Sequence, residues 1–318
     1  MTHAEMDAIA IDGKSSPTTA AFSKGIVWGA WLGVWLGVLG LLSGVTAVAV
    51  AQTAPKVAQP AVAPSAGAAP VAAVAVAAQV QLHPWQAALP RLIPEAYFTN
   101  LNDGDSIETP RVVKFGLSGG WGLAPIAKAM GGKAGHHHLL VNRDLPLDFK
   151  QALPFSDQYI HFGKGQMETV LTLAPGTYKL RLLLADDKHI PHFVYSKPLS
   201  ITVTKKNTVD PKSLVNPGVE LMVGSSTSGE QKRPFRAQFH ASGLSIAHQA
   251  QAEKDTGHFR LTMMSDKGFK AAEMDFVNGQ TEVWLEPPVG DYTLKLDLVD
   301  NLNPARVVSA TPVNVKVR

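Results

Sequence analysis

Two consecutive segments of this 318-residue chain, both after residue 90, repeat each other. Residues 161–203 align with residues 275–317 without a gap, and the shift is constant, as 279 − 165 = 114 shows for the glycines of two Gly-Gln pairs. The matched positions are those that shape turns and strands: Gly165-Gln166 with Gly279-Gln280, Glu168 with Glu282, Tyr178 with Tyr292, and Leu180, Leu182 and Leu184 with Leu294, Leu296 and Leu298. Such a repeat predicts two domains of one fold. Because the Gly-Gln pair occurs in both, a structural role in a turn is favoured for it over a chemical one.

Both repeats consist of short β-type segments separated by turn residues. In residues 178–184, leucines alternate with Lys179 and Arg181, which is the period of a half-buried strand. A Gly-x-Tyr sequence opens this segment and resembles the tyrosine corner before strand F of immunoglobulin-like domains. We therefore predict an all-β chain with two tandem immunoglobulin-like (Greek-key) β-sandwich domains, at residues 91–205 and 206–318. Another Greek-key sandwich or a barrel is the alternative.

The chain begins with a segment typical of exported proteins. Residues 1–24 are polar, and residues 25–51 contain no charge, which is long enough for an apolar helix to cross a bilayer. Ala49-Val50-Ala51 matches the small-x-small pattern of signal-peptidase cleavage, whereas the length of the apolar run favours a retained anchor. Both interpretations stay open. In either case Lys14 and Lys24 keep the amino terminus cytoplasmic.

A low-complexity linker is expected between this helix and the repeats. Residues 52–90 are rich in Ala, Pro, Val and Gln, and this composition predicts a disordered spacer. The expected location is the cell envelope. The two domains would be anchored in the inner membrane through residues 25–51, or secreted to the periplasm if cleavage follows Ala51.

The composition excludes several kinds of function. The net charge is +3 and no run of Lys or Arg occurs, so nucleic acid is not expected as a partner. The chain has no cysteine, which excludes disulfides, thiolate metal ligands and a blue-copper centre. Any metal site must therefore use histidine, carboxylate or methionine side chains.

Histidines are concentrated in the first repeat, and the second repeat lacks most of them. The six are His136, His137, His138, His161, His189 and His192. Their counterparts are, in the same order, His258, Phe259, Arg260, Asp275, Asn303 and Arg306. The scaffold is shared while the imidazoles are not, so a purely structural role for all six is hard to reconcile with the second repeat.

The predicted topology gathers these histidines at one rim of the first domain. If residues 135–141 form strand C and residues 178–185 form strand F, the B–C and F–G connections emerge at the same end, as does the D–E region that contains His161. The period of a strand places His136 and His138 on one face and His137 on the other, toward the core.

Histidine clusters of this kind can bind Zn or Cu, which favour three or four imidazole ligands. The candidate ligands are His136, His138, His161, His189 and His192, with His137 less favoured because its counterpart is a phenylalanine. Asp186, Asp187 and Glu168 are candidates for orienting the imidazoles from a second shell. The alternatives are a hydrogen-bonded rim and a patch that gains charge below about pH 6.5.

Four motifs follow one another in the first repeat. They are Gly135-His-His-His-Leu-Leu, His161-Phe-Gly-Lys-Gly-Gln-x-Glu, Pro175-Gly-x-Tyr and Leu184-Ala-Asp-x-x-His-x-x-His192. In this order they resemble an uncharacterised family of exported bacterial domains, catalogued only as a domain of unknown function. Met167 departs from that pattern, which commonly has Thr there. The resemblance implies export, and it implies that the histidines are a signature of the family. It implies no ligand and no reaction. The second repeat looks like a divergent copy.

Together these features lead to one functional hypothesis and two alternatives. The hypothesis is a non-enzymatic envelope protein whose first domain binds a transition metal ion, with the second domain as a spacer or docking domain. One alternative is a module that binds another envelope protein through the same rim without a metal. The other is a metal-dependent enzyme with an open coordination position.

Overall fold

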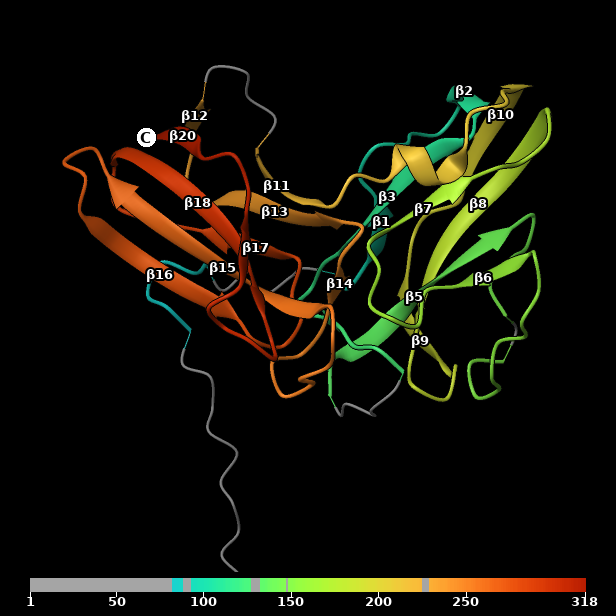
Figure 1. Cartoon of the computed structure of the whole chain (residues 1–318), viewed down its shortest axis with the longest axis horizontal. Coiled ribbons are helices and arrows are strands. Elements are labelled where there is room, and N and C mark those ends of the chain that lie inside the picture. The colour runs from blue at the N-terminus through green and yellow to red at the C-terminus, as the bar shows by residue number, and fades with distance from the viewer. Residues whose placement is uncertain (1–81, 88–92, 127–131, 147, 225–228) are drawn as a thin grey trace, which may run out of the picture. The chain divides into compact units, whose positions relative to one another are not determined.

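The computed structural model describes residues 82–87, 93–126, 132–146, 148–224 and 229–318. These residues form 20 strands and one 3-10 helix, Pro211–Leu214, and they contain no α-helix (Figure 1). Both repeats belong to one compact unit, Ala75–Arg318. The expected segments 1–24 and 25–51 and the linker up to residue 81 lie outside the described residues. Among those described, no helix combines the length and the apolar character needed to span a bilayer.

The first repeat consists of two sheets. The smaller sheet has the order β1-β3-β7, with β1 Ala96–Phe98, β3 Arg111–Leu117 and β7 Glu168–Leu171. The larger sheet has the order β2-β10-β8-β5-β4, with β2 Ser106–Thr109, β10 Leu199–Lys206, β8 Gly176–Ala185, β5 Ala134–Val141 and β4 Gly122–Leu123. Two further strands, β6 Tyr159–His161 and β9 Pro191–Tyr195, pair with β5 and β8.

The second repeat has the same strands in the same order. Its smaller sheet is β11-β13-β17, with β11 Gly218–Val223, β13 Phe235–Ser242 and β17 Glu282–Leu285. Its larger sheet is β12-β20-β18-β15-β14, with β12 Glu230–Gln231, β20 Val313–Val317, β18 Gly290–Asp300, β15 Thr256–Ser265 and β14 Ser245–Ile246. The remaining strands, β16 Lys270–Phe276 and β19 Val307–Ser309, pair with β15 and β18.

This arrangement confirms the predicted tandem immunoglobulin-like sandwich. Strands β1, β3 and β7 correspond to A, B and E, while β5, β8 and β10 correspond to C, F and G. The tyrosine corner is present in both repeats, because the Tyr178 hydroxyl donates to the Ala174 carbonyl at 3.0 Å and the Tyr292 hydroxyl donates to the Pro288 carbonyl at 3.1 Å. One detail differs from the prediction. His161 ends β6, which pairs with β5, so it lies in the larger sheet beside the other histidines.

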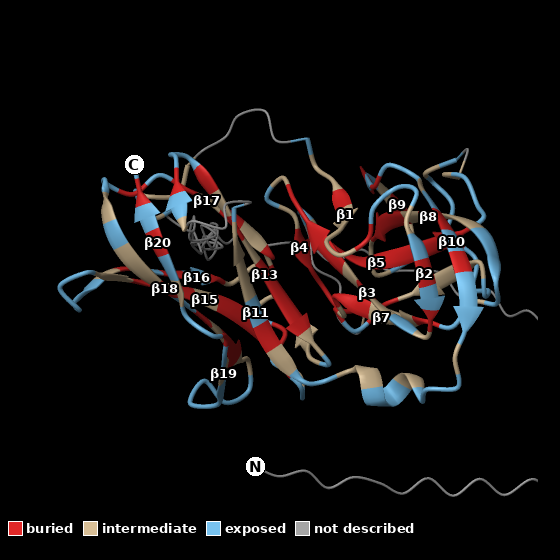
Figure 2. Cartoon of the chain, turned by 90° about the horizontal axis from the view of Figure 1, so that it is seen from above, coloured by how far each residue is buried: buried red, intermediate tan, exposed pale blue. Residues whose placement is uncertain are grey.

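Strand β5 is buried on both faces. Leu139 and Val141 point into the core between the sheets, together with Leu180, Leu182 and Leu184 of β8. On the opposite face, Leu140 packs in a second, small cluster with Leu153, Leu183 and Ala185. Figure 2 shows β5 in red, the colour of buried residues, whereas β2 and β10 carry exposed residues in pale blue. The outer face of this sheet is therefore covered at β5, unlike the solvated face of a typical sandwich sheet.

The covering segment is residues 148–158, which precede β6 and supply Phe149 and Leu153 to the small cluster. The second repeat has no equivalent, because β15 and β16 are joined by only Asp266–Phe269. The cover is therefore specific to the repeat that carries the histidines.

The two repeats contact each other through reciprocal backbone hydrogen bonds. The Leu123 amide of β4 donates to the Gly279 carbonyl at 2.8 Å, and the Ile246 amide of β14 donates to the Gly165 carbonyl at 2.9 Å. Since Gly165 and Gly279 are repeat counterparts, as are β4 and β14, the contact is made twice with the roles exchanged. Such self-complementarity is the property of a two-fold interface.

The recurring Gly-Gln pairs build this contact. Gln166 Oε1 accepts from the Lys164 amide at 2.9 Å, and Gln280 Oε1 accepts from the Asn278 amide at 3.0 Å, so each glutamine closes the turn before it. Gly165 has φ +81°, and a Cβ atom there would overlap the Ile246 carbonyl. The structural role predicted for the pair is thus confirmed, and it includes packing between the repeats.

Residues 82–87 pair with the second repeat. The Ala87 amide donates to the Trp284 carbonyl at 2.9 Å, and the Glu286 amide donates to the Trp85 carbonyl at 2.8 Å, which adds this segment to the edge of β17. These residues fall inside the expected linker 52–90. A fragment that begins at residue 90 would therefore lack a strand partner of β17.

We expect Gly165→Ala to destabilise the protein more than Gly104→Ala. Both glycines have positive φ, +81° and +86°, so both substitutions incur a backbone strain of about 1–2 kcal/mol. At Gly104 a Cβ meets no atom within 4 Å, whereas at Gly165 it overlaps the other repeat, which adds about 1–3 kcal/mol. Urea unfolding of the two variants measures the difference. Equal free energies of unfolding would contradict the role of Gly165 in joining the repeats.

Candidate metal centre

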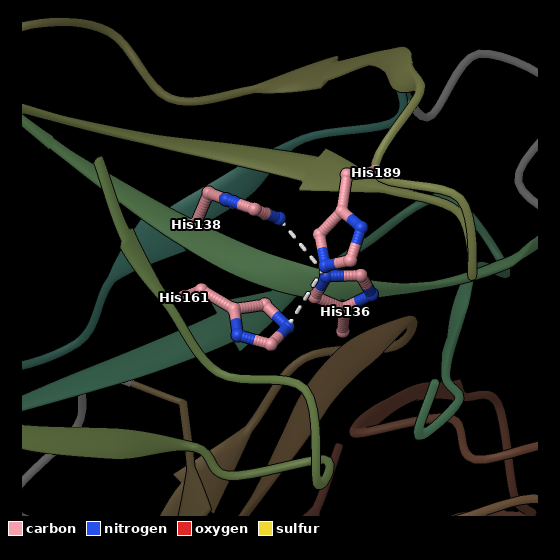
Figure 3. A group of neighbouring side chains, drawn as sticks. All are labelled: His136, His138, His161 and His189. Atoms are coloured by element: carbon pink, nitrogen blue, oxygen red, sulfur yellow. Dashed lines mark hydrogen bonds between the residues drawn. The ribbon is translucent and has the colours of Figure 1, made fainter. Parts of the chain in front are cut away.

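Four of the six histidines meet on the outer face of the larger sheet of the first repeat. His136 and His138 project from β5, His161 ends β6, and His189 lies in the connection from β8 to β9. Strand β5 brings the first two together because residues two apart share a face. The pairing of β5 with β6 then sets His161 directly opposite His138. Figure 3 shows the four imidazoles turned toward one another.

The ring nitrogens of this four-histidine cluster lie close together. His136 Nε2 and His138 Nε2 are 2.9 Å apart, and His161 Nε2 and His189 Nε2 are 3.2 Å apart. One ligand atom from each of the four side chains lies within 4.8 Å of all the others. For comparison, a tetrahedral Zn²⁺ site with bonds of 2.0–2.1 Å separates its nitrogens by about 3.3 Å. A square-planar Cu²⁺ site of similar bond length has separations of about 2.9 and 4.1 Å.

Burial disfavours the charged form of three of the four imidazoles. His136 and His138 are fully buried, while His161 and His189 are partly exposed. Burial, reinforced by the neighbouring imidazoles His138, His161 and His189, lowers the pKa of His136 to about 2. Burial and the neighbouring imidazoles lower the pKa of His138 to about 3, and they also lower the pKa of His161. Neutral imidazole is the form that ligates metals.

The turn that carries His189 is fixed by Asp186. Its Oδ1 accepts hydrogen bonds from the amides of Lys188 at 2.9 Å and Ile190 at 2.8 Å. His189 itself adopts φ +64°, a left-handed conformation that is uncommon for a residue other than glycine. Backbone strain of this kind persists only where surrounding contacts impose it, and it is concentrated at functional sites.

The predicted ligand His192 lies apart from the cluster. Its Nε2 is 3.1 Å from the Ala134 carbonyl, and its ring packs against Trp121 at a centroid distance of 4.7 Å. It therefore anchors the start of β5 from β9. His137 faces the core, as expected from its phenylalanine counterpart, and its ring packs edge-on against Phe115. Neither nitrogen of His137 has a hydrogen-bond partner among the described residues.

The three carboxylates expected behind the imidazoles have other surroundings. Asp186 stabilises the turn described above, and no hydrogen bond of Asp187 is found among the described residues. Glu168 lies in the smaller sheet and accepts from the second repeat, namely from His240 Nε2 at 3.0 Å and the Ser242 hydroxyl at 2.6 Å. Glu168 thus takes part in the contact between the repeats.

The second repeat holds an ion pair at the equivalent place. Arg260 and Asp275 are paired across β15 and β16 in the register of His138 and His161. The guanidinium donates to both carboxylate oxygens, at 2.7 and 3.1 Å. His258, the counterpart of His136, lies 3.6 Å from the same carboxylate. The neighbouring His258 and Arg260 hold the pKa of Asp275 at about 2.

The sequence did not predict that residues 148–158 cover the four-histidine cluster. The Leu153 amide donates to the His189 carbonyl at 2.9 Å. The Phe155 ring meets the His161 and His189 rings edge-on, at centroid distances of 5.3 and 4.7 Å. The one signal in the sequence was the length of the segment between β5 and β6, which the second repeat does not match.

Comparison with known proteins identifies a family but no characterised relative. A model of the family described as "Domain of unknown function (DUF4399)" matches residues 113–204 and 237–318, which together make up more than half of the chain. The two matches agree with the expectation of an uncharacterised domain present as two copies. No curated protein sequence matches the chain.

Several solved structures share local similarity with the chain. The fibronectin(III)-like modules of Clostridium thermocellum CbhA are 13% identical, with 70% of this chain and 92% of theirs covered and a TM-score of 0.23. Domains FN1–FN3 of chicken CNTN1 are 10% identical, with 71% and 67% covered and a TM-score of 0.22. A two-domain fibronectin type III segment of chicken tenascin is 11% identical, with 70% and 96% covered and a TM-score of 0.18. Scores this low carry no argument, so the fold assignment rests on the strand order of this chain.

We expect His137→Phe to remove part of the acid sensitivity of the metal-free protein. Burial lowers the pKa of His137 to about 3, whereas an unfolded histidine titrates near 6.5, so the unfolded state binds the extra proton between these values. Stability from this residue is complete above about pH 6.5 and decreases below it, by about 2 kcal/mol at pH 5. Urea unfolding at pH 7.5 and pH 5, with chelator, should show the variant losing less stability than the wild type. An identical loss in both proteins would contradict this.

Proposed function

The chain belongs to the DUF4399 family, and we propose that its first repeat binds a divalent transition metal ion, Zn²⁺ or Cu²⁺, through His136, His138, His161 and His189. The observation that carries the proposal is the convergence of four imidazole nitrogens within 4.8 Å of one another. Imidazole is a preferred ligand of both ions, and four of them make a full tetrahedral or square-planar set.

The alternative of a purely hydrogen-bonded cluster fits these residues less well. The four imidazoles form only two hydrogen bonds among themselves, and the Nδ1 atoms of His136 and His138 have no partner among the described residues. A buried polar atom without a partner costs about 1–3 kcal/mol. A metal ion bound to the Nε2 atoms, which already converge, would replace the two hydrogen bonds with four coordination bonds.

The second repeat supports a link between strands at this position. There the site of His138 carries the Arg260 guanidinium, and the site of His161 carries the Asp275 carboxylate that holds it. The second repeat thus links the two facing positions of β15 and β16 through an ion pair. In the first repeat a metal ion bound to both imidazoles would link the equivalent positions of β5 and β6.

The proposed role is to hold a metal rather than to use it in catalysis. Four protein ligands leave a tetrahedral ion without the open position that a catalytic site keeps for water or substrate. The cell envelope is the proposed location, which rests on the sequence of residues 25–51 alone, and an envelope protein partner for the second repeat is part of the same proposal.

Metal titration of the full-length chain, made without a His tag, tests the proposal directly. We expect one Zn²⁺ or Cu²⁺ ion per chain by elemental analysis and calorimetry. His161→Ala and His189→Ala should each weaken binding about a hundredfold or more, since even residues behind the ligands contribute 10–100-fold. His192→Ala is the matched control, because it removes a half-buried imidazole outside the cluster. Absence of binding at micromolar metal would exclude the proposal and favour a metal-independent module.

We also expect the ion pair of the second repeat to be convertible into a metal site. Replacing both partners, Arg260→His and Asp275→His, puts two imidazoles in the register of His138 and His161, beside the existing His258. Three imidazoles suffice for zinc, so a second and weaker binding event should appear in calorimetry. Arg260→His alone is the control and should add none. If the double variant folds and still binds a single ion, the equivalence of the two places is wrong.

A further inference from the structure

The four histidines differ in their access to solvent. His136 and His138 have no exposed surface, whereas His161 and His189 are partly exposed. An ion that approaches from solvent therefore meets His161 and His189 first. The side chain that packs against both of them is Phe155.

Phe155 lies over this entrance without being buried itself. Its ring contacts His161 and His189 edge-on, and 66% of its surface is exposed. A phenylalanine with that exposure gains little from the hydrophobic effect. Its position is instead set by the backbone hydrogen bond from the Leu153 amide to the His189 carbonyl and by Leu153 in the small cluster below.

The cover is anchored at a second place that leaves the histidines untouched. Phe149 stacks on Phe193 with a centroid distance of 4.5 Å and an interplanar angle of 5°. Phe193 is 76% exposed and has no ring contact with the cluster among the described residues. The cover thus carries one exposed aromatic contact at the histidines and one away from them.

We propose that Phe155 is a gate that controls how fast a metal ion enters and leaves the four-histidine cluster. This inference rests on the proposed function of the cluster. Moving the Phe155 side chain requires loss of two aromatic contacts and leaves the sheet intact. Local openings of this size occur far more often than global unfolding. The gate would therefore retain the ion kinetically while the histidines determine its affinity.

The test is the exchange rate of Zn²⁺ in the full-length chain. Stopped-flow mixing with Zn²⁺ measures association, and mixing of the loaded protein with excess chelator measures dissociation. Phe155→Ala should raise both rates about tenfold, which is the effect of about 1.4 kcal/mol on a barrier, and change Kd by less than about threefold. Phe193→Ala, the matched control, should leave both rates within about twofold of wild type. Phe155→Trp, which enlarges the side chain, should slow both rates, an effect that a loss of folding does not produce.

The other outcomes of the exchange experiment lead to different conclusions about Phe155 and the metal site. If Phe155→Ala raises only the dissociation rate and weakens Kd by the same factor, Phe155 holds the ligands in place and the gate is wrong. If neither rate changes in either Phe155 variant, the gate is wrong while the metal site stands. If the wild-type chain binds no Zn²⁺, the proposed function fails and the gate fails with it.

Discussion

Strand β5 is covered on both faces, and the organisation of the first repeat follows from this. Its inner face meets the smaller sheet in the usual way of a sandwich. Its outer face carries His136, His138 and Leu140, and polar rings on a covered face must find partners or remain neutral. The cover at residues 148–158 excludes water from them, and the neighbouring elements β6 and β8–β9 contribute the two further imidazoles. The cluster exists because one strand has no solvent face.

The contact between the repeats depends on a different constraint, which is close approach of backbone to backbone. Gly165 and Gly279 lie where a side chain would overlap the other repeat, and each repeat supplies both halves of the contact. Each repeat therefore needs both the donor strand and the acceptor turn. This explains why the Gly-Gln pair is shared by both repeats while the histidines are not. The interface and the four-histidine cluster are therefore separate features of one scaffold.

The sequence predicted the parts of the site that depend on periodicity and topology. The shared face of His136 and His138, the inward turn of His137 and the meeting of His161 with His189 all follow from strand period and strand order. It did not predict what depends on the paths of loops. The irregular segment 148–158 has no period to interpret, so Phe155 gave no signal of its own. Asp186 comes directly after β8, and the sequence therefore suggested that its carboxylate orients the imidazoles. In the structure its Oδ1 instead accepts from two backbone amides.

The two repeats differ in the charge and the burial of the side chains at equivalent positions of their larger sheets. In the second repeat Arg260 and Asp275 neutralise each other and stay partly exposed, so no cover is needed and a short turn suffices. In the described part of the first repeat no carboxylate pairs with the four imidazoles, and burial lowers the pKa of His136 and His138 far below neutrality. A proton therefore competes poorly for these nitrogens, whereas a metal ion recovers the energy of desolvation through several bonds at once. A covered, all-imidazole cluster thus disfavours protons, and the metal binding that we propose would use nitrogens that the cover keeps free of them.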